Sequence, residues 1–298
     1  MTNYATRFMC EIGFEDEAIA SLSGDLEKIY SEESAKALFE KCICEYDRSC
    51  ELDYTALCKK AAKAGEIVGV HKYSAELLLF ICLSKRLRER YAERGIDDSI
   101  WHDSMCDLKW KLWECKAVKG VYGSFVAYWF DGWFNLTRFA LGRLQFEIEY
   151  APGEYHFGTM VLTPSAKVIN VHIPRTLTPL DKESREDSYR RAAEFFKGEL
   201  GGAPTVFVCH SWLLYPPAEK ILPSHSNIRG FMADYHIVQY GENKENEHPD
   251  MWRLFDMDFT GSAADYPEDS SLRAAYKKFL MEGNRTGWGY GVFIARHR

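Results

Sequence analysis

The first hundred or so residues carry apolar positions at the spacing of an α-helix. Within residues 98–116, for example, apolar residues fall at i, i+4, i+7 and i+11, so they line one side of a helix that must pack against a neighbour. Those residues are Trp101, Met105, Leu108 and Leu112. Cap and stop residues separate the segments, such as Ser74 before one and Gly95 after it. The pattern predicts an all-helical region with helices over 25–48, 53–64, 74–91 and 98–116.

Residues 121–143 form a dense aromatic passage, VYGSFVAYWFDGWFNLTRFALGR. We expect a helical connector here, interrupted near Gly132, that leads from the helical region into a sheet. A chain of 298 residues is long enough for two ordinary domains. The prediction is therefore a helical N-terminal domain over 1–120 and a second domain over 121–298, with the connector at its start.

Strand-like patterns begin at Leu144. LQFEIEY alternates apolar and polar residues, and FGTMVLT and KVINVHIP follow it with the turn PSA between them, which predicts three antiparallel strands in succession. TVFVCHSW is a short apolar run of the kind found in a buried central strand. Further helices are predicted over 184–200, 226–235 and 269–283, and further strands over 236–242 and 288–298. This order indicates an α+β fold, with a mixed sheet and flanking helices behind the helical domain.

The charge pattern argues against a nucleic-acid partner. Lys and Arg total 37 against 44 Asp and Glu, for a net charge of −7, and the two signs are interleaved. Binding to a phosphate backbone needs a concentrated basic face. The N-terminus lacks the features of a secretory signal, and the longest apolar stretch, residues 77–83, is far short of the roughly 20 residues that span a bilayer. We therefore expect a cytoplasmic protein with no membrane partner.

The nine cysteines indicate neither disulfides nor metal. An odd, scattered set is not a disulfide framework, and reduced thiols fit the expected compartment. Cys42, Cys44, Cys50 and Cys58 do not have the C-x₂-C spacing of structural zinc sites. No metal site is predicted.

Several short strings occur in one order along the second half of the chain. They are LGRLQFE at 141–147, VHIP at 171–174, the spaced residues Ser188, Ala192, Phe195 and Phe196, CHSWLL at 209–214 and SNI at 226–228. In this order the strings resemble bacterial acyltransferase-like proteins that pair a helical N-terminal domain with a GNAT-like C-terminal domain. The resemblance covers nearly the whole chain, and its specific strings lie within residues 141–230.

The resemblance implies a GNAT-type sheet in which two neighbouring strands splay apart and hold acyl-CoA or acetyl-CoA between them. KVINVHIP and TVFVCHSW would be that pair, and backbone groups left unpaired by the splay would bond the pantetheine amides. The phosphates would lie at the N-terminus of the helix that begins near Ser184. On this analogy the acyl-CoA contacts are Val171, Ile173, Arg175 and Ser188.

One feature departs from the resemblance. The usual pyrophosphate loop has spaced glycines, whereas RTLTPLDKESRED, residues 175–187, has none. The leading hypothesis is an N-acyltransferase that moves an acyl group from acyl-CoA, or from an acyl carrier protein, to a small-molecule amine. The alternative is a non-catalytic module on the same scaffold that has lost CoA and binds a small ligand or peptide.

The candidate catalytic residues lie on the predicted strands. His172 and His210 could each act as a base that takes a proton from the acceptor, or each could be a hydrogen-bonded histidine at a strand end. Ser211 cannot pair with its neighbour His210 because adjacent strand residues face opposite ways, but its hydroxyl could donate to a thiolate or an oxyanion. Glu147 is either a general base or a solvated carboxylate.

Three more residues carry two interpretations each. Ser226 and Asn227 fit a helix cap and also fit contacts to a substrate. Arg175 fits a phosphate contact and also fits a surface salt bridge.

Overall fold

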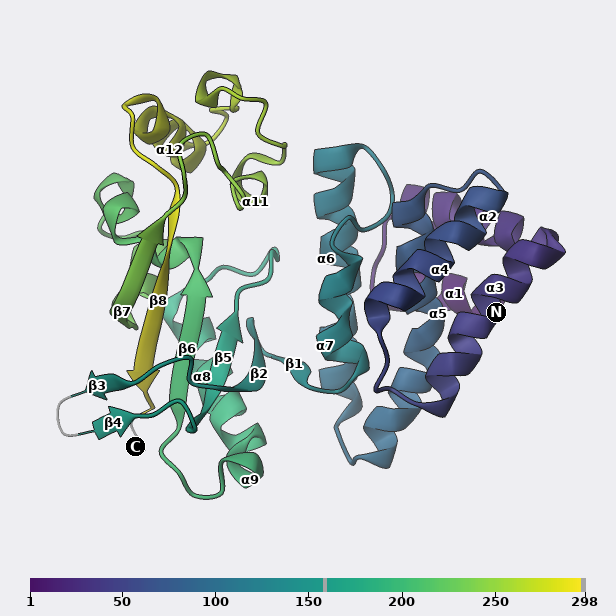
Figure 1. Ribbon diagram of the computed structural model, residues 1–298, viewed down its shortest axis with the longest axis horizontal. Coiled ribbons are helices and arrows are strands. Elements are labelled where there is room, and N and C mark those ends of the chain that lie inside the picture. Colours follow the sequence, from purple (N-terminus) through teal and green to yellow (C-terminus); the bar gives the residue numbers. More distant parts are fainter. Residues whose placement is uncertain (158–159, 296–298) are drawn as a thin grey trace. The chain divides into compact units, whose positions relative to one another are not determined.

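The computed structural model describes residues 1–157 and 160–295 (Figure 1). The chain forms two compact units, Met1–Ala140 and Leu141–Arg298. Two predicted strands run partly outside the described residues: 158–159 fall within FGTMVLT, and 296–298 end the last predicted strand.

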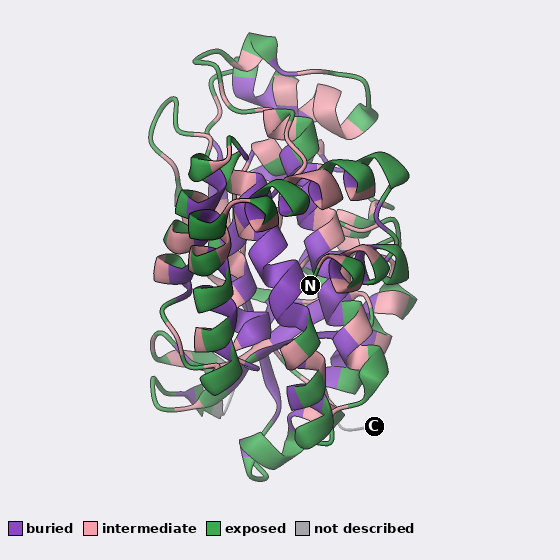
Figure 2. Ribbon diagram, turned by 90° about the vertical axis from the view of Figure 1, so that its right-hand side faces the viewer, coloured by how far each residue is buried: buried purple, intermediate pink, exposed green. Residues whose placement is uncertain are grey.

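The N-terminal unit is a helical bundle, as the sequence predicts. Its most buried element is α5 (Lys72–Glu93), in which every residue from Leu77 to Leu83 is at most 1% exposed. Figure 2 shows buried residues gathered on the inner side of the bundle and exposed residues on its outer turns. No helix of the described residues has the length and apolar character needed to cross a membrane. The other helices are α1 (Thr2–Glu11), α2 (Asp16–Ser31), α3 (Glu33–Arg48), α4 (Tyr54–Ile67), α6 (Asp98–Lys119), η1 (Ala127–Phe130) and α7 (Asp131–Phe134).

The aromatic segment 121–140 belongs to this helical unit and not, as its pattern predicts, to the start of the second domain. Phe80 of α5 packs against Phe130 and Phe134, with ring centroids 5.0 and 4.8 Å apart. The Tyr46 hydroxyl donates to the carbonyl of Phe134 at 3.0 Å. The aromatic composition shows where the helical periodicity of the first region ends. It does not show which of the two units buries the aromatic rings, because that depends on packing.

Among the described residues a mixed sheet of six strands forms the core of the second unit, and its first strand, β1, begins in the last residues of the helical unit; the predicted α+β class is confirmed. The strand order is β1-β2-β5-β6-β8-β7. Strand β5 runs parallel to β6, while β2 pairs with β5, and β8 with both β6 and β7, in antiparallel fashion. The strands are β1 (Arg138–Leu141), β2 (Leu144–Tyr150), β5 (Lys167–His172), β6 (Val206–Ser211), β7 (His236–Glu242) and β8 (Gly287–Ile294).

The predicted meander of three strands is wrong. Strand β2 pairs directly with β5, from Gln145↔His172 to Tyr150↔Lys167. The middle run instead joins β3 (Tyr155–Phe157) and β4 (Met160–Leu162) in a separate two-stranded sheet. Tyr155 and Leu162 pack on an apolar cluster of the main sheet that includes Val208 and Val292. Leu162 of the middle run therefore packs on one face of the main sheet, while its strand pairs outside the hydrogen-bond ladder of that sheet.

The opposite face of the sheet is covered by α8 (Lys182–Phe195). Tyr189 of this helix packs on Phe207 and Phe293, with centroid distances of 5.2 and 4.8 Å. Because side chains alternate along a strand, Phe207 and Cys209 share this face, while Val208 and His210 point to the other. The remaining helices of the unit are α9 (Lys197–Leu200), η2 (Trp212–Leu214), η3 (Pro216–Ile221), α10 (Asn227–Ala233), α11 (Trp252–Phe255), η4 (Ala263–Asp265) and α12 (Ser271–Met281).

Residues 243–286 connect β7 to β8 and carry α11, η4 and α12. They build a small core of their own on Phe255 and Tyr266, whose rings stack 3.8 Å apart. Asp256 links this connection to the chain after β5, since its carboxylate accepts hydrogen bonds from both Arg175 and Arg273.

Candidate functional site

Strands β5 and β6 lie side by side and then separate. Their register contains only Ile169↔Phe207 and Asn170↔Val208, although each strand has six residues. By contrast, β6 pairs with β8 along its whole length, to Ser211↔Gly289. The last residues of β5 and β6 therefore diverge toward their carboxyl ends, as the sequence analysis expected of KVINVHIP and TVFVCHSW.

The two candidate histidines flank this opening on one face of the sheet. Directly opposed residues of neighbouring strands share a face, and so do residues two apart on one strand. His172 lies two positions beyond Asn170, and His210 lies two positions beyond Val208. Both imidazoles thus project from the same face, one on each diverging strand.

His172 is hydrogen-bonded to Glu147 of β2. Its Nε2 lies 2.5 Å from Oε1 of Glu147, and the two side chains are 19% and 13% exposed. A carboxylate only accepts, so Nε2–H is the donor, and an imidazole protonated at Nε2 has its basic lone pair on Nδ1. Glu149, on the same face, accepts from the Asn170 amide at 2.7 Å. Glu147 is therefore a partner of His172, which neither sequence interpretation of this carboxylate included.

His210 has a different environment. Its ring packs at a tilt against Trp288 of β8, with centroids 4.6 Å apart, and it has no hydrogen-bond partner among the described residues. Burial lowers the pKa of His210, and Asp250 acts weakly in the opposite direction. Burial therefore favours the neutral form of this imidazole.

The candidate serines have structural partners. Ser211 accepts from the backbone N–H of Leu213 and caps η2, at 3.1 Å. Ser226 accepts from the backbone N–H of Arg229 and caps α10, while Asn227 is the exposed first residue of that helix. For Ser226 the structure supplies the cap that the sequence suggested.

The loop between β5 and α8, residues 173–181, occupies the place where the resemblance puts the CoA phosphates. Arg175 is engaged by Asp256, which matches the salt-bridge interpretation of that residue. Asp181 caps α8 by accepting from the N–H of Ser184 at 2.9 Å, and this hydrogen bond lowers the pKa of Asp181. Ser188, fully buried, donates to the carbonyl of Ser184 at 2.7 Å and accepts from the N–H of Arg143 at 2.8 Å.

One cluster of the described residues has the donor set for a metal ion. Ligand atoms of Glu147, Glu149 and His172 lie within 4.8 Å of one another. The hydrogen bonds from His172 to Glu147 and from Asn170 to Glu149 account for this arrangement without an ion.

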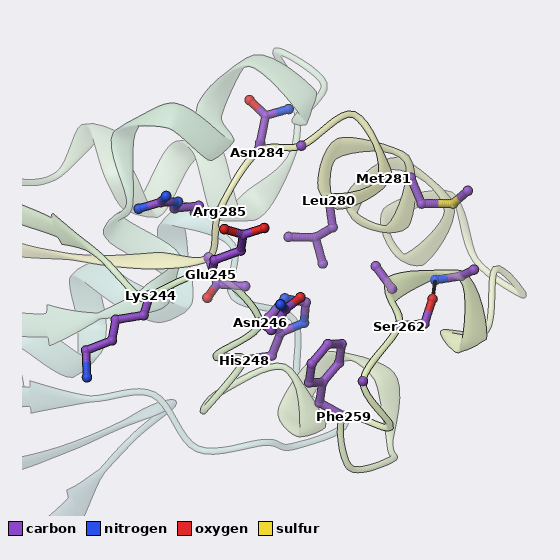
Figure 3. Close-up of a pocket in the computed structure, with 15 residues that line it drawn as sticks. Lys244, Glu245, Asn246, His248, Phe259, Ser262, Leu280, Met281, Asn284 and Arg285 are labelled. Carbon is purple, nitrogen blue, oxygen red and sulfur yellow. Dashed lines mark hydrogen bonds between the residues drawn. The ribbon is translucent and has the colours of Figure 1, made fainter.

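A cavity of about 530 Å³ lies in the 243–286 connection (Figure 3). His248 forms part of its wall, stacked on Phe259 at 4.0 Å and hydrogen-bonded to the Tyr266 hydroxyl at 2.8 Å. Burial lowers the pKa of His248. The cavity lining ends at Thr286, directly before β8. Because β8 runs antiparallel to β6, the cavity lies beyond the carboxyl end of β6, where β5 and β6 separate to form the slot. No sequence pattern predicts this cavity, since its lining comes mostly from loops without a repeating pattern.

The family models match both units. Residues 138–293 match the GNAT-like C-terminal domain, and residues 3–136 match the N-acyltransferase N-terminal domain. The first match covers more than half of the chain. The chain belongs to this family, in which a helical N-terminal domain precedes a GNAT-like C-terminal domain, and the resemblance inferred from LGRLQFE, VHIP, CHSWLL and SNI is confirmed.

Solved structures of similar fold include an acyltransferase mutant in complex with octanoyl-CoA, with a TM-score of 0.78. Two others are an acyltransferase in complex with decanoyl-CoA and teicoplanin and one in complex with CoA and 10C-teicoplanin, each with a TM-score of 0.76. All three are 18% identical, over 98% of this chain and 88% of theirs. At this identity the likeness shows the shared fold. A search of curated proteins found no match.

Proposed function

We propose that the chain transfers an acyl group from acyl-CoA to the amine of a small molecule. The observation that carries the proposal is the divergence of β5 and β6 after Asn170↔Val208, with a hydrogen-bonded histidine beside the opening. Main-chain groups of Val171, Ile173 and Cys209 would bond the pantetheine amides, because backbone groups that lack a strand partner need another one. An acyl carrier protein presents the same pantetheine thioester and is the second donor to test.

In the proposed reaction the amine nitrogen attacks the thioester carbonyl carbon, the C–S bond breaks, and CoA leaves as the thiolate. His172 takes the proton of the amine through Nδ1, and the resulting imidazolium is stabilised by the Glu147 carboxylate at Nε2. That proton then neutralises the thiolate, so the products are an amide and free CoA. The slot contributes by holding donor and acceptor in contact.

The other candidates have supporting roles in this proposal. His210 packs against Trp288, and burial lowers its pKa, so this imidazole is suited to hydrogen-bond the acceptor or the thioester rather than to carry charge. The Ser211 hydroxyl would donate to the oxyanion while its oxygen still accepts the hydrogen bond from the N–H of Leu213. Ser226 and Asn227 would contact the acceptor, and a cytoplasmic location would supply acyl-CoA.

The test is binding followed by turnover. Thermal shifts are measured with acetyl-CoA, octanoyl-CoA and decanoyl-CoA and with acylated carrier protein, and a ligand at 100 times its Kd should stabilise by about 2.7 kcal/mol. The stabilising donor is then incubated with a panel of amines, and release of the CoA thiol is measured. No stabilisation by any thioester would contradict the proposal.

A second candidate is a non-catalytic binding module. It is favoured by the glycine-free loop, in which Arg175 is paired with Asp256 and the α8 N-terminus already holds the carboxylate of Asp181. Turnover of acyl-CoA with any amine of the panel would exclude it.

A further inference from the structure

The β5–α8 loop is tied to the body of the unit through its carbonyl groups. Arg143 donates from Nε to the carbonyl of Thr178 at 2.7 Å and from Nη1 to the carbonyl of Pro174 at 3.0 Å. Ser184 donates to the carbonyl of Pro179 at 3.0 Å. Side chains thus hold carbonyl oxygens along the length of a loop that contains no glycine.

Arg143 is itself held in place. It follows Gly142, whose φ of 83° lies in the left-handed region, and a Cβ at Gly142 would lie 2.8 Å from Oγ of Ser188. That close approach lets Ser188 accept from the N–H of Arg143. The guanidinium is half-buried, and burial lowers the pKa of Arg143 to about 10, with Asp181 acting in the opposite direction. It stays charged at neutral pH, so its bonds to carbonyls are charge-assisted.

The fixed carbonyls determine where the loop amides point. In a trans peptide the C=O and the following N–H point in opposite directions, and the loop peptides are trans. Because the carbonyl of Pro174 faces Arg143, the N–H of Arg175 faces away from it. The carbonyl of Pro179 faces Ser184, so the N–H of Leu180 also faces outward, and it has no acceptor among the described residues.

We propose that Arg143 is a positioning residue for the donor: by holding the carbonyl of Pro174 it keeps the N–H of Arg175 turned toward the CoA pyrophosphate, and its bond to the carbonyl of Thr178 fixes the course of the loop. In a glycine-rich loop the main chain can turn its amides toward the phosphates because glycine is conformationally free. Here the side-chain contacts of Arg143 hold the main chain in such an arrangement. The inference rests on the proposed function, since it requires acyl-CoA in the slot. It concerns the phosphate end of the donor and leaves the thioester end to β5 and β6.

The test compares two donors that differ in the phosphate end. Binding of octanoyl-CoA and of S-octanoylpantetheine, which lacks the nucleotide and pyrophosphate, is measured by calorimetry for the wild type and for Arg143→Gln and Arg143→Lys. Arg143→Gln is expected to weaken the binding of octanoyl-CoA roughly tenfold or more, because charge-assisted hydrogen bonds are lost. It should weaken the binding of S-octanoylpantetheine by less than about twofold. Arg143→Lys, which keeps the charge and one donor, should fall between the wild type and Arg143→Gln. The matched control is Arg190→Gln on α8, an exposed arginine paired with Asp187, which should change neither affinity.

Each outcome decides between the two proposals. Equal weakening of both donors by Arg143→Gln, or no weakening of octanoyl-CoA, overturns the role of Arg143 and leaves acyl transfer standing. If the Gln variant does not fold, the Lys variant gives the decision, because an unchanged preference for octanoyl-CoA over S-octanoylpantetheine would equally overturn the role. A wild type that binds neither donor overturns both this inference and the proposed function.

Discussion

The hydrogen bond between His172 and Glu147 makes a specific prediction for the variant Glu147→Gln. The amide of Gln has nearly the shape of the carboxylate and can still accept a hydrogen bond from Nε2. What it cannot do is stabilise the positive charge that His172 gains when it removes the proton of the amine. The substitution should therefore lower kcat and leave the KM of the donor nearly unchanged.

The magnitude follows from the geometry. Two unit charges separated by the 2.5 Å between Nε2 and Oε1 interact by about 1.7 kcal/mol in water and by about 6.6 kcal/mol at an effective dielectric constant near 20. Since the two side chains are 19% and 13% exposed, screening by solvent is substantial. We expect a loss of about 2–3 kcal/mol of transition-state stabilisation, which is roughly a 30- to 160-fold fall in kcat.

The assay follows CoA thiol release from octanoyl-CoA with the amine that gives the fastest turnover. The control is Glu149→Gln, which removes the same charge from the same face of β2 but bonds Asn170 in place of the histidine. The kcat of the Glu149→Gln variant should fall by less than about fivefold. A fall of under threefold for Glu147→Gln, or an equal fall for both variants, would refute the assignment of His172 and Glu147 as a catalytic pair.

Three further predictions concern stability. Burial raises the pKa of Glu76 to about 7, so the contribution of Glu76 to wild-type stability should fall as the pH rises from 4.5 to 7; Glu76→Gln should then be more stable than the wild type by about 1–2 kcal/mol at pH 8 and equally stable at pH 4, as read from thermal unfolding. Gly289→Ala should cost about 3 kcal/mol or more in urea unfolding, because its Cβ would lie 2.1 Å from a main-chain oxygen, and a loss below 1 kcal/mol would contradict that contact. Asp256→Asn removes the carboxylate between its two arginine partners and should lower stability by about 1–2 kcal/mol at pH 7. These arginines hold the pKa of Asp256 below its ordinary value despite burial. The difference in stability between the variant and the wild type should therefore shrink below pH 3.8.

Helical periodicity was enough to predict the N-terminal bundle, because each helix buries one side and the apolar stripe is visible in the sequence. It could not predict the unit boundary. The rings of Phe130 and Phe134 would be buried equally well by either unit, and only the structure shows them against Phe80. The same limit explains the wrong meander, since an alternating run signals a half-buried strand without saying which strand it pairs with.

The candidate site was predictable as separate residues but not as an arrangement. His172, His210 and Glu147 could all be selected from the strands, yet the bond between His172 and Glu147 depends on the register of β2 against β5. A slip of one residue would turn Glu147 to the other face. Arg143 lies within the quoted string LGRLQFE, but its role depends on carbonyls more than thirty residues away, and no local pattern in the sequence marks such contacts.

The central claim is that the diverging ends of β5 and β6 hold an acyl thioester. A crystal structure of the protein with octanoyl-CoA tests it most directly. We predict the thioester between Val171–His172 and Cys209–Ser211, with pantetheine amides bonded to these main chains and the pyrophosphate beside residues 173–181. Octanoyl-CoA bound elsewhere, or β5 and β6 paired through His172 and His210 with the ligand outside them, would contradict the claim.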